Sequence, residues 1–273
     1  MVRVTTTTAT APRGTAAAAL AALAVQDVTV RFAGLTALDA VSFTVEPGSV
    51  HAVIGPNGAG KSTCFNVLSG VYRATSGHVR LGDTRLTGLP PHAIADLGVA
   101  RTFQNLALPP HATVADSLLL GRHRLTRSGF LATGLRLPFA VREERRHRER
   151  VREIAEFIGL EEELERPAGS LPYGQQKLVE LGRALCMEPR VLLLDEPIAG
   201  MTADERRRTA AVVADVRDSL GISIVLVEHD MGVVMRLADA VTVLDFGRRI
   251  AGGTPAEVQN DPAVVQAYLG APQ

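Results

Sequence analysis

Short apolar runs alternate along this chain with segments whose apolar residues recur every three to four positions. Four of the runs are mostly apolar throughout, as expected of strands buried on both faces of a parallel sheet: 50–54, 191–194, 223–227 and 241–244. Three other runs predict an antiparallel part: 28–32, 41–45 and 79–81. Because segments with helical spacing, such as Leu178, Leu181 and Leu185, also occur, the pattern predicts an α/β fold.

The pattern turns helical from about residue 111 to residue 170. Val151, Ile154, Phe157 and Ile158 form one apolar stripe, and Gly159 is the expected C-terminal cap of that helix. We therefore expect a helical subdomain over 111–170, inserted into the rest of the chain. The other divisions expected are a core of 22–110 and 171–256, a disordered extension at 1–21 and a C-terminal tail at 257–273.

Composition narrows the class of protein. The 29 Lys and Arg residues equal the 29 Asp and Glu residues, so no global field attracts nucleic acid and no nucleic-acid partner is expected. Cys64 and Cys186 are too few for a disulfide framework, which fits a reducing cytoplasm. No window of the sequence holds the eighteen or more apolar residues that read as a membrane span.

Residues 55–63 have the spacing of a phosphate-binding loop, or P-loop, and they stand between a predicted strand and a predicted helix. In such a loop successive backbone N–H groups converge on an anion, and the helix adds the positive end of its dipole. The predicted binding residues are Gly55, Pro56, Asn57, Gly58, Ala59, Gly60, Lys61, Ser62 and Thr63. Lys61 supplies a mobile charge and Ser62 a ligand for Mg2+, so the sequence predicts nucleotide binding.

A P-loop alone does not distinguish kinases, GTPases, helicases and transport ATPases. The apolar run 191–194 ends in Asp195 and Glu196, as a Walker B strand does. Asp195 is the expected ligand of Mg2+, directly or through water. Glu196, one residue beyond the strand, is placed to polarise the attacking water as a general base.

The segment from Leu171 to Gln175 stands about twenty residues before Asp195, where ATP-binding-cassette (ABC) ATPases carry the signature Leu-Ser-Gly-Gly-Gln. It matches at Leu171, Gly174 and Gln175, but Pro172 and Tyr173 replace Ser and Gly. Further family marks follow in order: Phe32, Gln104 and His229. The chain therefore resembles ABC ATPases. That implies a P-loop NTPase with a RecA-like parallel sheet core, an antiparallel β subdomain and an inserted α-helical subdomain.

The resemblance also implies roles for these residues. Phe32 would stack on adenine, and His229 would hold the γ-phosphate. Gln104 would sense that phosphate, report to a channel and share Mg2+ with Ser62 and Asp195. Tyr173, Gly174 and Gln175 would meet the nucleotide of a partner cassette, so ATP and Mg2+ are the implied cofactors. A lone His or Gln carries little information, but six marks in the right order from 32 to 229 are specific.

Several segments resemble one ATPase subunit of branched-chain amino-acid importers over about residues 24–270: Glu228-His229-Asp230-Met231, Gly253-Thr254-Pro255 and the tail from Asp261 to Gly270. This resemblance implies a peripheral motor on the cytoplasmic face of the cell membrane. Its implied partners are a second cassette in a heterodimer, two transmembrane permease subunits and, indirectly, a solute-binding protein.

Two other functions stay open at the level of sequence. Soluble ABC proteins act in translation or DNA repair, but they usually carry two cassettes or a long coiled coil before the signature, and this chain shows neither. A transport motor could also serve another cargo, such as urea, another small solute or exported lipopolysaccharide. The cargo is chosen by the receptor and channel subunits, so this sequence does not encode it.

Overall fold

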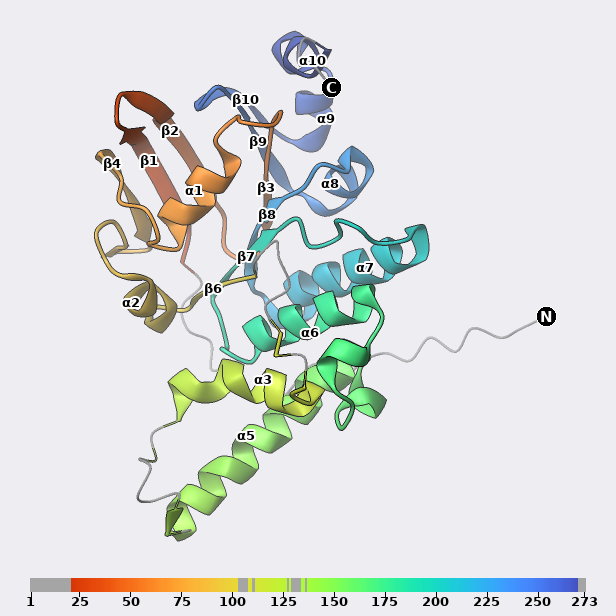
Figure 1. Ribbon diagram of the computed structural model, residues 1–273. Coiled ribbons are helices and arrows are strands. Elements are labelled where there is room, and N and C mark those ends of the chain that lie inside the picture. The colour runs from red at the N-terminus through yellow and green to blue at the C-terminus, as the bar shows by residue number, and fades with distance from the viewer. Residues whose placement is uncertain are drawn as a thin grey trace, which may run out of the picture.

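The computed structural model describes residues 21–102, 108–109, 111–126, 128, 134–135 and 137–269. The fold consists of two sheets with helices around them. The larger sheet has six strands in the order β10–β9–β3–β8–β7–β6 (Figure 1). Their bounds are Val50–Ile54 for β3, Val99–Arg101 for β6, Val191–Asp195 for β7, Ser223–Val227 for β8, Ala240–Asp245 for β9 and Arg248–Gly253 for β10. Strand β10 is antiparallel to β9, and the other pairs are parallel, as the four apolar runs predict.

The smaller sheet is antiparallel, with the order β2–β1–β4–β5. Its strands are Leu23–Phe32 for β1, Leu35–Val45 for β2, Ser76–Leu81 for β4 and Thr84–Arg85 for β5. The antiparallel part expected from the sequence is therefore present. Its strands are longer than the apolar runs, because their partly exposed positions carry polar residues such as Asp39 and Ser42.

Helices cover the larger sheet on both sides and extend below it (Figure 1). Those around the sheets are Lys61–Leu68 (α1), Pro91–Asp96 (α2), Tyr173–Leu185 (α6), Ala203–Leu220 (α7), Met231–Leu237 (α8), Pro255–Gln259 (α9) and Pro262–Leu269 (α10). The described residues within 111–170 contribute Val114–Arg122 (α3), Pro138–Phe157 (α5) and the 3-10 turns His123–Leu125 (η1), Glu161–Glu163 (η2) and Ala168–Ser170 (η3). Within the described part of the chain, no helix has the length and apolar character needed to cross a bilayer.

The continuous apolar runs follow from burial on both faces of the larger sheet. In β7, Leu192 and Leu194 face a core shared with α6 and α7, whereas Val191 and Leu193 face a core that includes Phe65 of α1. Side chains alternate between the faces of a strand, so a strand covered on both sides is apolar at every position. This burial fixes the direction in which the end of β7 presents the residues that follow it.

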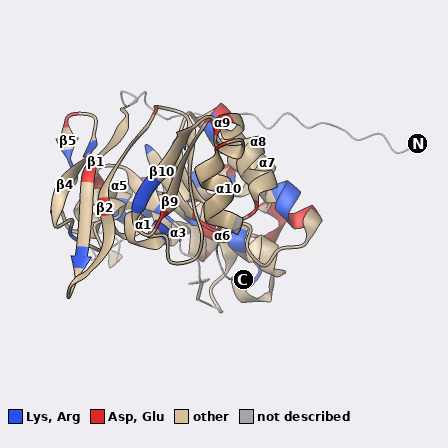
Figure 2. Cartoon of the chain, turned by 90° about the horizontal axis from the view of Figure 1, so that it is seen from above, with Lys and Arg blue, Asp and Glu red and all other residues tan. Residues whose placement is uncertain are grey.

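The helices of 111–170 pack on α6 through the predicted stripe. Val151, Ile154 and Ile158 are buried, and Gly159 follows the helix with a left-handed φ of 70°. Packing is close because Gly182 of α6 has no side chain: a Cβ there would lie 2.6 Å from Cδ1 of Ile158. Figure 2 shows Lys and Arg dispersed among Asp and Glu over the elements around the sheets, in line with the balanced charge.

His51 is a buried polar residue in the middle of the parallel sheet. Its ring stacks on Phe43 with centroids 4.9 Å apart, and Nε2 lies 2.9 Å from Oγ1 of Thr242. Burial, together with the nearby positive charge of Arg249, lowers its pKa from 6.5 to about 4. The imidazole is therefore neutral in the folded chain at pH 7.

Lowering the pH is expected to reduce the free energy of unfolding, because the buried His51 resists protonation in the folded chain. Since the folded pKa of about 4 lies below the unfolded value of 6.5, the unfolded chain takes up this proton first as pH falls. The stabilisation is fully present above pH 6.5 and is lost progressively toward pH 4, by roughly 3 kcal/mol in total. Urea denaturation across this pH range measures the loss, and His51→Gln should show a shallower slope. Equal slopes would contradict the assignment.

Candidate nucleotide-binding site

The P-loop joins the end of β3 to the start of α1, which begins at Lys61. Two of its glycines are needed for close backbone approach. Gly55 has φ 148°, and a Cβ there would lie 2.0 Å from the carbonyl oxygen of Leu244. Gly60 has φ 102°, and a Cβ there would lie 2.7 Å from the carbonyl oxygen of Ala37. The loop is therefore held between β9 and β2 in a shape that other residues would distort.

Lys61 is buried at the first position of α1. Its Nζ donates to the carbonyl oxygens of Gly55, at 2.6 Å, and Pro56, at 2.8 Å. Burial lowers its pKa, and the negative charges of Glu196 and Asp195 oppose that shift. The ammonium group thus lies inside the loop, within reach of the electrostatic field of Asp195, at the end of β7, and of Glu196, which follows it.

Asp195 ends β7 and is buried against a cation that sequence reasoning did not assign. Arg101, at the end of β6, forms an ion pair with Oδ2 of Asp195 at 2.9 Å and also donates to Asn66 and Ser69 of the P-loop helix region. The sequence pattern assigned no role to Arg101. Parallel pairing of β6 with β7 is the signal that places it here.

Glu196 and His229 are 33 residues apart in sequence and meet at the ends of β7 and β8. Glu196 has a left-handed φ of 49°, and its N–H donates to the carbonyl oxygen of Val227 at 2.9 Å. Its Oε1 lies 2.8 Å from Nε2 of His229. The predicted general base and the predicted phosphate-binding histidine therefore form one hydrogen-bonded pair.

Glu228 supports this pair through hydrogen bonds to the backbone at or near each member, a role that the sequence did not reveal. Its Oε1 accepts from the N–H of Ile198 at 3.1 Å and its Oε2 from the N–H of His229 at 3.0 Å. Burial raises its pKa, and the backbone donors, among them Ile198 and His229, oppose that rise. One buried carboxyl group thus connects the segment after Glu196 to the segment that carries His229.

The signature segment, Leu171 to Gln175, lies at the start of helix α6. Helix α6 begins at Tyr173, after Pro172 with φ −53° and ψ 150°, so a proline precedes the first turn. The Tyr173 ring packs against Gly200, and Nζ of Lys177 lies 5.9 Å from its centroid. Tyr173, Gly174 and Gln175 thus occupy the first turn of the helix.

The start of the signature helix already faces an anion of the same chain. Glu205 caps α7, where its Oε2 accepts from the N–H and Oγ1 of Thr202. Hydrogen bonds from Thr202 and, more weakly, from the backbone of Gly174 lower its pKa. A Cβ at Gly174 would lie 2.6 Å from Oε1 of Glu205, so a larger residue here would displace the Glu205 side chain.

The fold therefore brings only some of the predicted site residues to one cavity. A cavity of about 870 Å3 is lined by residues 55–59 of the P-loop, His229, Phe246 and part of α10. Tyr173, Gly174 and Gln175 do not line it. Phe32 ends β1 and makes an edge contact with Tyr72, with ring centroids 5.1 Å apart. Gln104 lies outside the described residues.

Comparisons with known proteins agree with this geometry. The family model of the ABC transporter matches residues 38–199, more than half of the chain. The chain belongs to the ABC transporter ATP-binding family. A second model, the branched-chain amino acid ATP-binding cassette transporter, matches residues 248–272. The predicted family and fold class are confirmed.

Individual ABC proteins are similar to most of the chain. It is 42% identical to the high-affinity branched-chain amino acid transport ATP-binding protein BraF of Pseudomonas aeruginosa, and 39% identical to LivG of Escherichia coli. Both alignments cover 91% of this chain and 97% of the relative. A crystal structure of an ABC transporter cassette in its ADP conformation superposes with a TM-score of 0.80, at 33% identity over 92% of this chain and 99% of that one. The ABC cassette is thus an ATPase with a motor role, and the soluble alternative is not favoured.

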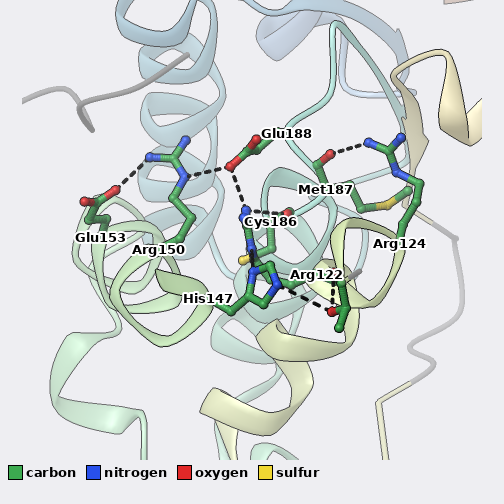
Figure 3. Close-up of polar contacts among 9 residues, drawn as sticks. Arg122, Arg124, His147, Arg150, Glu153, Cys186, Met187 and Glu188 are labelled. Carbon is green, nitrogen blue, oxygen red and sulfur yellow. Dashed lines mark hydrogen bonds and ion pairs between the residues drawn. The ribbon is translucent and has the colours of Figure 1, made fainter. Parts of the chain in front are cut away.

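The far end of the signature helix of this ABC cassette is held by charged side chains from α3 and η1 (Figure 3). Arg122 donates to the carbonyl oxygen of Cys186 at 3.1 Å and to Glu188 at 2.7 Å, and Arg124 donates to the carbonyl oxygen of Met187 at 2.8 Å. Positive groups at this end also complement the helix dipole. We call these contacts the α6 clamp.

His147 of α5 orients the α6 clamp. Its Nδ1 accepts from Nε of Arg122 at 2.9 Å, and because an arginine only donates, this nitrogen carries no proton (Figure 3). Burial, reinforced by the charge of Arg122, lowers the pKa of His147. The α3, α5 and α6 helices are thus joined by one buried polar network near the point where the chain enters β7.

Proposed function

We propose that this ABC ATPase drives an importer of branched-chain amino acids, and that Gly55–Thr63, Asp195, Glu196 and His229 form its nucleotide site. The observation that carries the site assignment is the 2.8 Å contact between Glu196 and His229, facing the end of the sheet where Lys61 lies. The match of residues 248–272 to the branched-chain family model, together with the relatives BraF and LivG, supports the cargo class.

Each residue has a chemical task in this proposal. The P-loop N–H groups and Lys61 bind the phosphates, and Phe32 stacks on adenine. Ser62, Asp195 and Gln104 would hold Mg2+, and the hydroxyl and carboxylate oxygens of Ser62 and Asp195 are of the type this ion prefers. When bound, Mg2+ neutralises charge on the transferred phosphoryl group. Glu196 accepts a proton from the attacking water, while His229 orients Glu196 and contacts the γ-phosphate.

The ATPase would act as one half of a sandwich. Each ATP meets the P-loop of one cassette and Tyr173, Gly174 and Gln175 of the other, so that closure needs two ATP molecules and hydrolysis reopens the pair. The proposed partners are a second, different cassette, two permease subunits in the membrane and, through them, a solute-binding protein. The cassette would lie on the cytoplasmic face of the membrane.

Reconstitution tests this function. The chain is co-expressed with the proposed second cassette and permeases, purified, and placed in proteoliposomes with the solute-binding protein. We expect leucine, isoleucine or valine to stimulate ATP hydrolysis and to be taken up with it, and the isolated chain to be mostly monomeric by light scattering with poor ATPase activity. Stimulation of ATP hydrolysis by urea alone would contradict the proposed cargo. A stable, highly active homodimer would contradict the proposed heterodimer.

Pro172 makes the two ATP sites of such a pair unequal. A serine at this position offers a hydroxyl and an N–H to the partner's γ-phosphate, and proline offers neither. Each donor to an anion contributes about 1.5–3 kcal/mol. Pro172→Ser is therefore expected to raise the apparent ATP affinity about tenfold at one of two sites, measured from the ATP dependence of hydrolysis in the assembled transporter.

A proline at another helix start provides the control for this change. Pro91 begins α2, so Pro91→Ser should leave the ATP dependence as in the wild type. If Pro172→Ser behaves like Pro91→Ser, the proline serves only as a helix start, and Tyr173 or the following N–H groups replace the missing donors.

A further inference from the structure

The side chain of Arg101 joins two elements of the site that the backbone leaves separate. Arg101 ends β6, the strand at the edge of the larger sheet next to β7 (Figure 1). Its Nη2 donates to Oδ2 of Asp195, the last residue of β7, at 2.9 Å. Its Nη1 donates to Oδ1 of Asn66 in α1 at 2.7 Å and to Oγ of Ser69, directly after α1, at 2.9 Å. One guanidinium group therefore connects the end of the Walker B strand to the helix that follows the P-loop.

The guanidinium group of Arg101 is anchored on α1 independently of Asp195. Besides the hydrogen bonds to Asn66 and Ser69, its Cζ lies 5.7 Å from the centroid of the buried Phe65 ring, within the range of a cation–π contact. The side chains of Arg101 and Asp195 are 10% and 9% exposed. Solvent and salt weaken an ion pair this well buried much less than an exposed one. The anchored cation is thus able to fix the orientation of the carboxylate.

The contact to Asn66 relates Asp195 to the start of α1. Asn66 follows Ser62 by four residues, and residues four apart in an α-helix lie on the same face, one turn from each other. Ser62 and Asp195 are both among the residues proposed to hold Mg2+. Arg101 therefore links the face of α1 that carries one proposed ligand to the carboxylate that supplies another. The ion pair uses Oδ2 of Asp195, which leaves Oδ1 as the oxygen for the metal.

We propose that Arg101 is a positioning residue for the metal site, which fixes Asp195 relative to Ser62 so that the two oxygen ligands are correctly spaced before Mg2+ binds. This inference rests on the proposed function, in which both residues hold Mg2+ beside the nucleotide. Mg2+ requires nearly ideal octahedral geometry, so its affinity depends on the spacing of its ligands. Arg101 acts through Asp195 and contacts neither the ion nor the nucleotide.

Binding of fluorescent ADP to the purified full chain, measured once with Mg2+ and once with EDTA, tests this role. Arg101→Lys keeps the positive charge but replaces the planar fork by a single ammonium group, which does not reach Asn66 and Asp195 in the same way. The Kd in EDTA should stay within about twofold of the wild type, because the P-loop N–H groups are unchanged. The Kd with Mg2+ should rise about tenfold, as is typical when a group that orients a metal ligand is lost.

Two further variants complete the test. Asn66→Ala leaves the ion pair with Asp195 in place and removes one anchor on α1, so it should weaken only the binding measured with Mg2+, by less than Arg101→Lys. Arg217→Lys is the matched control. Arg217 also pairs with an aspartate, Asp239, which directly precedes β9 and so lies at the end of the parallel sheet opposite the P-loop. Both Kd values of Arg217→Lys should equal those of the wild type.

The outcomes separate positioning from stability and from the site assignment. An equal rise of both Kd values, with a lower thermal unfolding midpoint, would show that Arg101 only stabilises the fold, and the proposal would be wrong. It would also be wrong if Asn66→Ala and Arg101→Lys behaved like Arg217→Lys, and if Arg101→Lys did not fold, Asn66→Ala alone would decide. If Lys61→Ala binds ADP as the wild type does, the P-loop assignment itself fails. If Lys61→Ala loses binding in both conditions while the Arg101 and Asn66 variants match the control, only the role of Arg101 fails.

Discussion

Replacing Glu196 by Gln is expected to slow ATP hydrolysis by at least about a hundredfold while leaving ATP binding intact. The amide cannot accept the proton of the attacking water, but it keeps the size of the carboxylate and a partner for His229, whose Nε2 lies 2.8 Å away. ATP should therefore bind and close the cassette pair without being cleaved. Steady-state hydrolysis by the assembled transporter and the retention of bound ATP measure the two effects.

A distant carboxylate provides the matched control for this substitution. Glu46 is exposed in the turn between β2 and β3, and Glu46→Gln changes the same functional group far from the site. Its turnover should equal that of the wild type. Turnover by Glu196→Gln within about fivefold of the control would assign the general base to another residue.

Lys61→Ala is expected to abolish measurable nucleotide binding. The ammonium group is the buried cation of the loop, and its two acceptors are the carbonyl oxygens of Gly55 and Pro56. Alanine removes the charge that would meet the phosphates and leaves both carbonyl groups without this donor. Binding of fluorescent ADP to the isolated chain measures the effect, with an expected rise in Kd of at least about a hundredfold.

Lys61→Arg distinguishes charge from shape. An arginine keeps the positive charge but carries a larger, planar head group, which does not fit the space between two carbonyl groups in the same way. We expect it to bind nucleotide far more weakly than the wild type. Binding by Lys61→Ala within about threefold of the wild type would contradict the assignment of the P-loop.

The central sheet and the P-loop were predictable from the sequence because their signals are local. Strands β3, β7, β8 and β9 are apolar at nearly every position since both faces are covered, and the P-loop is one continuous segment. Strand β6 has only three residues and β10 carries Arg248 and Arg249, so neither has a periodic signal. Both were missed, and with β6 the position of Arg101.

The supporting residues of the site depend on contacts between distant segments. Glu228 accepts a hydrogen bond from Ile198, 30 positions away, and Arg101 pairs with Asp195, 94 positions away. No spacing rule connects such pairs. Their partners become visible only when the parallel register places the ends of β6, β7 and β8 side by side. The predicted roles of Phe32, Gln104 and the signature residues remain predictions.

The α6 clamp has a mechanical consequence. Helix α6 has 13 residues, so about 20 Å separates its clamped end from the turn that contains Tyr173. Because Arg122 and Arg124 hold this end, any tilt of the helix would pivot at Cys186 and Met187. A tilt of about 10° about that pivot carries Tyr173 through roughly 3 Å, the length of one hydrogen bond. A small rotation at the clamped end would thus be enough to make or break one hydrogen bond at Tyr173.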